Sequence, residues 1–233
     1  MSYYNGPKVV TDGLVLCVDA NNTKSYPSTG TSAFNLAASN TFTFNANLSW
    51  QSGAPSYFLS DGTDDSLMTT HSSNLNIPYY FTLEGWIWWS QHKLYSNLLV
   101  KGSGGSGNTF NYSFFFYDTS IVCGAGDGST FYSTGLAVSS GYINTGMWHH
   151  LVGTFNGTTF KIYVDGVERS STTYSPFTLY QNNYDLSIIQ NSYSLNGRVS
   201  TARVYNICFT PSQVLQNFNA TKGRFGQIGR AHV

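Results

Sequence analysis

Acidic side chains that could act as a catalytic pair are scarce in this chain of 233 residues. Its only two glutamates are Glu84 and Glu168, and neither has an acidic residue two positions away. Hydrolysis of a glycosidic bond needs two carboxyl groups flanking that bond, and alternate residues of one strand share a face on which such a pair can lie. Because this spacing is missing, the sequence predicts a protein that is not an enzyme.

Other patterns that support catalysis are also weak. The adjacent pair His149-His150 could suggest general base chemistry. Neighbouring residues of a strand point to opposite faces, however, so we expect one ring under core packing and the other outside. The chain contains no Gly-x-Ser-x-Gly motif, which would place a nucleophilic serine on a sharp turn. We therefore predict no general-base role for this pair.

Three aspartates form the one acidic cluster of the sequence: Asp61, Asp64 and Asp65, in the segment DGTDD. Carboxylate and carbonyl oxygens are the ligands that Ca²⁺ prefers. The cluster could thus form an oxygen cage for calcium together with backbone carbonyls. The alternative is a solvated turn held by hydrogen bonds from its own aspartate side chains. Calcium is therefore a possible cofactor, and no other cofactor is expected.

Aromatic residues are abundant, with 17 Tyr, 16 Phe and 5 Trp. Flat rings stack on the C–H faces of sugars, and short polar side chains orient the hydroxyl groups. Strand alternation over 81–89 places Thr82, Glu84, Trp86 and Trp88 on one face, opposite an apolar set. We predict that Trp86 and Trp88, with Glu84, form a glycan-binding surface. The alternative is that both tryptophans lie beneath a loop or a partner subunit.

The elements that would position these residues are mostly strands. Asn156-Gly157 and Asp165-Gly166 are pairs suited to type I′ hairpin turns, which need positive φ at both central residues. They predict strands over 148–155, 158–164 and 167–172, in an antiparallel meander. Between the turns, Phe160, Ile162 and Val164 alternate with polar residues and are expected to face the core.

One helix is predicted near the end of the chain, where Thr210, Pro211 and Gln213 resemble a capping box with proline at the first helical position. Its apolar stripe of Val214, Leu215 and Phe218 is expected to pack across the sandwich edge.

Composition indicates one all-β domain. Only 9% of the residues are charged, 16% are aromatic and 23 are glycine, which favours strands and tight turns over helices. The formal net charge is zero, so no basic surface for nucleic acid is implied. The apolar runs are of strand length, so no membrane insertion is expected.

Several segments resemble, in order, the laminin-G-like family of the concanavalin A-like lectin/glucanase superfamily. They are SDGTDD at 60–65, FTLEGWI at 81–87, LLVKG at 98–102, the WHHLV to IYVDG meander at 148–166, and NGR through RVYN and TPS at 196–212. The resemblance implies a two-sheet antiparallel β-sandwich, a concanavalin A-like jelly roll, with a short C-terminal helix. An immunoglobulin-like sandwich is the alternative.

The same resemblance bears on the ligand site. Pentraxin relatives hold Ca²⁺ and ligand with oxygen side chains from two loops. The loop that matches the first of these, 107–111, offers Asn108 and Asn111 but no carboxylate. The resemblance therefore implies that the pentraxin calcium site is absent, and it makes Asn108 and Asn111 candidate glycan-binding residues.

The two ends of the domain resemble laminin-G-like proteins of tailed phages more closely. The matching segments are GLVLCVDA at 13–20, TKSYP at 23–27 and LQNFNATKGRFG at 215–226. This resemblance implies a virion protein, made in the host cytoplasm, with other virion proteins as partners and a homo-oligomer as a further possibility. The first residues lack the basic and apolar regions of a signal peptide, which agrees with such an origin.

Three cysteines, Cys17, Cys123 and Cys208, are scattered along the chain. An odd number without a Cys-x-x-Cys motif favours free, buried thiols over a disulfide, and it gives no indication of zinc.

The last residues, QIGRAHV at 227–233, match one reading frame of a common sequencing adapter. We therefore predict a native domain over 1–226 and a non-native tail over 227–233. A genuine tail of this composition is the alternative.

Two functions of different classes follow. The first is a non-catalytic module on the virion surface, as capsid decoration, fibre or tail-associated protein, which binds glycans or another part of the host surface. The second is a purely structural domain that docks onto other virion proteins and binds no sugar. A glucanase-like enzyme is a weaker third hypothesis, because the carboxylate pair is missing.

Overall fold

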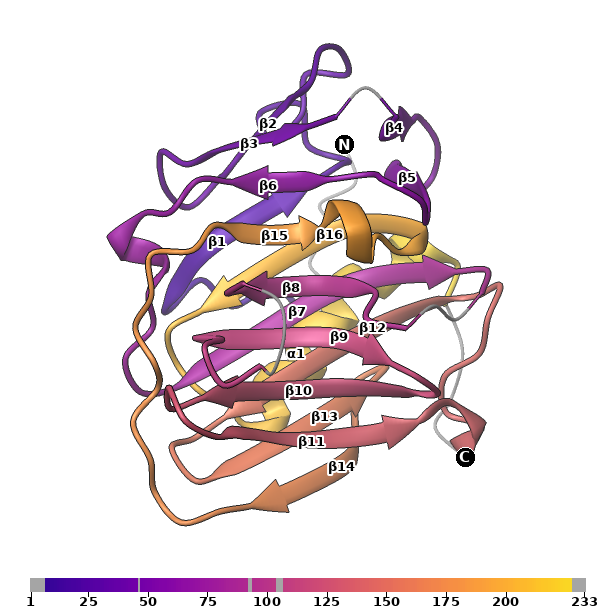
Figure 1. Cartoon of the computed structure of the whole chain (residues 1–233). Helices are drawn as coiled ribbons and strands as arrows, with labels where there is room; N and C mark the ends of the chain where they lie inside the picture. Colours follow the sequence, from indigo (N-terminus) through magenta and orange to yellow (C-terminus); the bar gives the residue numbers. More distant parts are fainter. Residues whose placement is uncertain (1–6, 46, 92–93, 104–106, 228–233) are drawn as a thin grey trace.

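The computed structural model describes residues 7–45, 47–91, 94–103 and 107–227. Within these residues, sixteen strands form two antiparallel sheets that lie face to face (Figure 1). We call them the first and the second sheet. The first sheet has the order β14 (Val167–Thr173), β13 (Thr159–Val164), β12 (Trp148–Phe155), β7 (Phe81–Trp89), β16 (Asn196–Tyr205), β5 (Tyr57–Asp61) and β4 (Ser49–Gln51), and β1 (Leu14–Asp19) also pairs with β16.

The second sheet supplies the other face of the sandwich. Its order is β11 (Phe131–Ala137), β10 (Ser120–Gly126), β9 (Tyr112–Tyr117), β8 (Asn97–Lys101), β15 (Leu186–Ile189), β6 (Leu67–Thr69), β3 (Thr41–Phe44) and β2 (Ser32–Phe34). Short 3₁₀ turns cover 73–75, 138–140, 191–193 and 222–225. This architecture confirms the predicted two-sheet antiparallel β-sandwich and agrees with a jelly roll.

The core lies between the sheets and is filled by alternate residues of each strand. On β7 the inward set includes Phe81, Leu83, Ile87 and Trp89, as the alternation predicts. On β13 the predicted inward residues Phe160, Ile162 and Val164 all belong to the same core. The apolar face of each strand therefore determines which side of the sheet is buried.

Both predicted hairpins are present, joining β12 to β13 and β13 to β14. Asp165 and Gly166 have φ of 51° and 84°, so this turn has the positive φ pair that type I′ requires. At the other turn only Gly157 has positive φ, at 96°. The type I′ prediction is wrong there, because Asn156 stands before the bend and its side chain accepts hydrogen bonds from the backbone of Thr158 and Thr159.

The predicted C-terminal helix is α1, Pro211–Thr221, and its capping box is formed by Thr210 and Gln213. Its position differs from the prediction. Val214 and Phe218 are buried, while Leu215 is partly exposed. The helix lies on the outer face of the first sheet instead of at the sandwich edge, because that face offers apolar and polar partners on β7, described below.

A buried charged network fixes this helix to the sheet. The Glu84 carboxylate on β7 is paired with Arg203 on β16 and lies 3.1 Å from the His150 ring on β12. It also accepts a hydrogen bond of 2.6 Å from Asn217 on α1. Burial alone would raise the pKa of Glu84, but Arg203, His150 and Asn217 lower it to about 2. The carboxylate therefore stays ionised beneath the helix.

Both histidines are buried, although we expected one of them outside. His149 points to the core side, where its ring lies beside Trp89 and its Nδ1 is 2.9 Å from the Asp165 carboxylate. His150 points to the opposite face, as strand alternation requires, but α1 covers that face. The prediction of an outside ring is wrong because it took the outer sheet surface to be exposed.

All three cysteines are free thiols, as predicted, but only Cys17 and Cys123 are buried and Cys208 is partly exposed. Within the described residues, no helix is long and apolar enough to cross a membrane.

Residues 228–233 of the predicted non-native tail lie outside the described residues. Gln227 lies inside them, and its side chain donates a 2.6 Å hydrogen bond to the Trp148 carbonyl.

Candidate functional site

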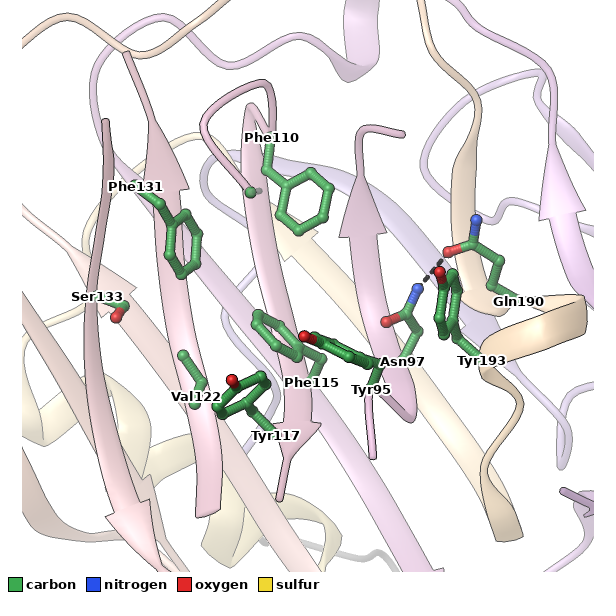
Figure 2. Close-up of a pocket in the computed structure, with 11 residues that line it drawn as sticks. Tyr95, Asn97, Phe110, Phe115, Tyr117, Val122, Phe131, Ser133, Gln190 and Tyr193 are labelled. Atoms are coloured by element: carbon green, nitrogen blue, oxygen red, sulfur yellow. Dashed lines mark hydrogen bonds between the residues drawn. The ribbon is translucent and has the colours of Figure 1, made fainter. Parts of the chain in front are cut away.

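A groove of about 500 Å³ crosses the outer face of the second sheet (Figure 2). Its volume lies within the range of sites that hold small ligands. It is formed by residues of β8, β9, β10 and β11, by Tyr95 before β8, by Gly107 and Phe110 before β9, and by Gln190 and Tyr193 after β15. The lining residues are Tyr95, Asn97, Gly107, Phe110, Phe115, Tyr117, Val122, Phe131, Ser133, Gln190 and Tyr193.

Strand alternation explains how the sequence builds this floor. On β9, Tyr112, Phe114 and Phe116 point into the core, so Phe115 and Tyr117 point outward into the groove. In the register of the sheet, Phe115 stands opposite Asn97 on β8 and opposite Val122 on β10. The site therefore rests on rigid, paired strands with aromatic residues on both faces.

Three tyrosines from different segments gather at one side of the groove. The ring centroid of Tyr95 lies 5.1 Å from that of Tyr117 and 5.8 Å from that of Tyr193, both edge to face. Tyr95 is 37% exposed and Tyr117 46% exposed, so the rings are open to solvent. They form an aromatic surface that a flat ligand can contact.

Tyr95 adopts an unusual backbone conformation, with φ of 62°. A bulky residue rarely occupies this left-handed region, and holding it there costs roughly 1–3 kcal/mol. Such strain is concentrated at functional sites in proteins. Here it places an exposed ring at the groove, which supports a role of Tyr95 in ligand contact.

Two amide side chains lie beside the tyrosines. The Nδ2 group of Asn97 donates to Oε1 of Gln190, as the dashed line in Figure 2 shows. The hydrogen bond orients both amides and leaves the Asn97 Oδ1 acceptor and the Gln190 Nε2 donors for other partners. This side of the groove can therefore orient hydroxyl or amide groups of a ligand.

The opposite half of the groove is apolar. Phe110, Phe115 and Phe131 surround it with ring centroids 6.0–6.4 Å apart, and Val122 packs with them. Two glycines make room for the rings. A Cβ atom on Gly102 would lie 2.3 Å from the Phe110 ring, and one on Gly124 would lie 2.5 Å from the Phe131 ring.

Two residues predicted to contact glycans, Glu84 and Trp86, lie on the other sheet and are buried. Glu84 is held in the charged network beneath α1. The Trp86 ring is fully buried, stacks on Phe225 and donates from Nε1 to the hydroxyl of Thr221. The prediction for these two residues is wrong, because α1 and the turn after it occupy the face on which a sugar would stack.

Trp88 lies at the margin of that covered face and is partly exposed. The guanidinium of Arg198 sits 4.0 Å from the centre of its ring and 4.8 Å from that of Tyr57. Arg198 therefore already contacts the flat surface that a sugar would need. Glycan stacking on Trp88 stays a prediction, on a different sheet from the groove.

The two predicted asparagines lie near the groove but differ in role. Asn111 is fully buried and bonds to the backbone of Ile77 and Tyr180, so the prediction that it binds ligand is wrong. Asn108 adjoins the groove residue Gly107, and its backbone oxygen accepts from Gly128. A ligand contact by Asn108 stays a prediction.

The three aspartates lie together at the end of β5 and in the turn that follows it, away from the groove. One carboxylate oxygen from each lies within 4.8 Å of the others. Asp61 accepts from Thr63 N and Asp65 accepts from Asp61 N, both at 2.7 Å, while Asp64 accepts from Asn47. Burial raises the pKa of Asp65. These bonds match the turn held by its own aspartates, and calcium binding there stays a prediction.

Of the groove residues, Gly107 and Phe110 lie in the loop 107–111 that the resemblance connected with ligand binding, but none was predicted to contact a ligand. A signal was present in YSFFFY at 112–117, where aromatic residues occupy both faces of a strand. Aromatic residues on an outward face need a cover or a ligand, as in the FTLEGWIWW strand. Both strands show this pattern in the sequence. Only the packing shows that α1 covers β7, the FTLEGWIWW strand, while the outward face of β9, the YSFFFY strand, is open.

The family model for the concanavalin A-like lectin/glucanases superfamily, Laminin_G_3, matches residues 61–215. The chain belongs to this family. The match runs from the aspartate turn through both hairpins into α1, and it confirms the laminin-G-like resemblance. No curated protein sequence matches this Laminin_G_3 chain significantly.

Solved structures share the fold of this Laminin_G_3 domain at low sequence identity. The binding domain of Paraclostridial Mosquitocidal Protein 1 is 16% identical with a TM-score of 0.69, covering 89% of this chain and 52% of that one. Trypanosoma rangeli sialidase is 17% identical with a TM-score of 0.65, covering 93% and 34%. Domain 4 of AbnA, a GH43 extracellular arabinanase from Geobacillus stearothermophilus, was solved in complex with arabinotriose. It is 20% identical with a TM-score of 0.64, covering 88% and 98%. The chain therefore spans about half or less of the first two proteins and nearly all of the third.

Proposed function

We propose that this domain is a non-catalytic carbohydrate-binding module and that its site is the groove on the second sheet. The observation that carries the proposal is the combination of two exposed tyrosines, Tyr95 and Tyr117, and the partly buried Tyr193 with the amide pair Asn97 and Gln190. Sugars present apolar C–H faces and polar edges, and this groove offers partners for both. The arabinotriose complex of an AbnA domain with the same fold supports this proposal.

Two features support binding without catalysis. The eleven described residues that line the groove include no carboxylate, whereas glycosidases use two. The buried Glu84 is fully engaged by Arg203, His150 and Asn217 beneath α1. Neither the groove nor this network offers the acid and base that bond cleavage requires.

We further propose that the domain works in many copies on a virion surface. This context rests on the resemblance of both ends to phage proteins. An open groove of modest size suits weak monovalent affinity, on the order of 0.1–1 mM or about 4–5.5 kcal/mol. Many linked sites on one particle would raise the overall avidity by about 10²–10⁴. A repeated surface protein would thus turn a weak site into stable adhesion.

Docking onto other virion proteins without sugar binding is the second candidate function. The exposed rings Tyr79 and Tyr80, whose centroids are 6.1 Å apart, favour it, because clustered exposed aromatics are typical of protein interfaces. Under this hypothesis the tyrosines of the groove would contact protein instead of sugar.

A glycan array followed by titration calorimetry tests the proposal. We expect the wild-type domain to retain a subset of glycans, and Tyr117→Ala to weaken their affinity by about tenfold or more. Tyr79→Ala, which removes a 67% exposed tyrosine outside the groove, is the matched control and should bind like wild type. If no glycan is retained, or if both variants bind equally well, the groove is not a carbohydrate site and the docking function is favoured.

A further inference from the structure

The groove has two halves of different chemistry that lie side by side. The apolar half is formed by Phe110, Phe115, Val122 and Phe131. The polar half is formed by Asn97 and Gln190 with the neighbouring tyrosines. A ligand that fills both halves must carry an apolar group next to hydrogen-bonding groups.

The register of the sheet determines how close the two halves are. Asn97 on β8 and Phe115 on β9 are cross-strand partners. Directly opposed residues have Cβ atoms about 5 Å apart. This spacing is comparable with the width of a single pyranose ring, so one sugar residue can reach both halves.

The charge of the lining limits the ligand further. None of the eleven described residues that line the groove carries a formal charge. Among these described residues, a carboxylate or sulfate group would lose hydration without gaining a cationic partner, which is unfavourable. The lining therefore favours a neutral sugar over a sialylated or sulfated one.

The apolar half also discriminates among neutral sugars. A plain hexose carries hydroxyl groups all around the edge of its ring, and an edge hydroxyl directed at the three phenyl rings would lack a hydrogen-bond partner. An acetamido substituent ends in a methyl group, which suits the phenyl rings. Its amide N–H and carbonyl can pair with the Asn97 Oδ1 acceptor and the Gln190 Nε2 donors.

We infer that the groove selects neutral glycans that contain N-acetylated amino sugars, with the acetamido methyl in the phenylalanine half and the sugar polar groups on Asn97 and Gln190. This inference rests on the proposed carbohydrate-binding function. It adds the substrate class, and it assigns the specificity to Phe110, Phe115 and Phe131.

Titration of the full chain with three matched probes tests the inference. They are the β1,4-linked trimer of N-acetylglucosamine, the β1,4-linked trimer of glucose, and the anionic sialyllactose. We expect the N-acetylated trimer to bind at least about tenfold more tightly than the glucose trimer, since one well-placed apolar group in a pocket discriminates by about 10–200-fold. Sialyllactose should bind weakest.

Variants locate the preference within the groove. Phe131→Ala should reduce the ratio of the two neutral affinities to about threefold or less, whereas Tyr79→Ala should leave it unchanged. A thermal melt shows whether each variant is folded, and the wild-type ratio tests the inference even if Phe131→Ala does not fold.

The outcomes separate this inference from the proposed function. Equal affinity for both neutral trimers, or tightest binding of sialyllactose, would overturn the N-acetyl preference while carbohydrate binding stands. If no glycan on the array and none of these probes binds, carbohydrate binding itself fails, and the inference fails with it.

Discussion

The indole ring of Trp86 and the phenyl ring of Phe225 are stacked, with centroids 3.9 Å apart and ring planes 6° apart. This contact joins the middle of β7 to the short turn after α1. It closes the outer face of the first sheet, and it explains why the second sheet, not the first, carries the open aromatic surface.

Removing this contact should destabilise the domain. Phe225 is 7% exposed, so Phe225→Ala should lower the free energy of unfolding by about 3–5 kcal/mol. It should also shift the tryptophan fluorescence to longer wavelength as Trp86 becomes hydrated. Leu215→Ala, on an exposed position of α1, is the control and should cost about 0.5 kcal/mol. Equal losses in the two variants, measured by urea denaturation, would contradict the role of the stack.

Shortening the chain tests the predicted tail. Deletion of residues 228–233 should leave the melting temperature unchanged. Deletion that also removes Gln227 eliminates its hydrogen bond to the Trp148 carbonyl, which should cost about 1 kcal/mol. Scanning calorimetry measures both. If the shorter deletion lowered the midpoint by several degrees, residues 228–233 would contribute to the fold and the adapter hypothesis would lose its support.

The buried network around Glu84 should make stability depend on pH. The pKa of Glu84 is about 2 in the folded protein and near 4.5 when unfolded. Because the folded pKa is the lower one, the network contributes fully above pH 4.5 and loses its contribution as the pH falls towards 2. The free energy of unfolding should therefore fall over this interval.

Glu84→Gln isolates this contribution from those of other carboxylates. Near pH 7 the variant should be less stable by about 3–5 kcal/mol, since Arg203 is left without its partner. The difference between wild type and variant should shrink as the pH approaches 2. Urea titrations at several pH values measure it, and a difference that does not change with pH would rule out the ionised network.

How much the sequence predicts depends on whether the information is local. The turn Asp165-Gly166, the capping box of Thr210 and Gln213, and the inward set on β13 are determined by neighbouring residues, and all three are confirmed. The cover over Trp86 depends on residues about 130 positions away. No local pattern indicates which outward aromatic face a distant helix will occupy, so the sequence could not predict that Glu84 and Trp86 are covered.

The cysteines give a chemical check of the fold. Cys123 is fully buried and burial raises its pKa, so it should resist a thiol reagent in the native state. Cys208 is the least buried of the three and should react first. After denaturation without reductant all three should react. Recovery of a single thiol would indicate a disulfide between the other two.

The central claim is that glycans bind in the groove over β8, β9, β10 and β11. Amide chemical shifts followed by NMR, during titration with the best neutral glycan from the array, test it most directly because they detect weak binding and locate it. We predict shifts concentrated around Tyr95, Asn97, Tyr117, Ser133 and Gln190. Shifts concentrated instead around Trp88 and Arg198 on the first sheet, with the groove unchanged, would contradict it.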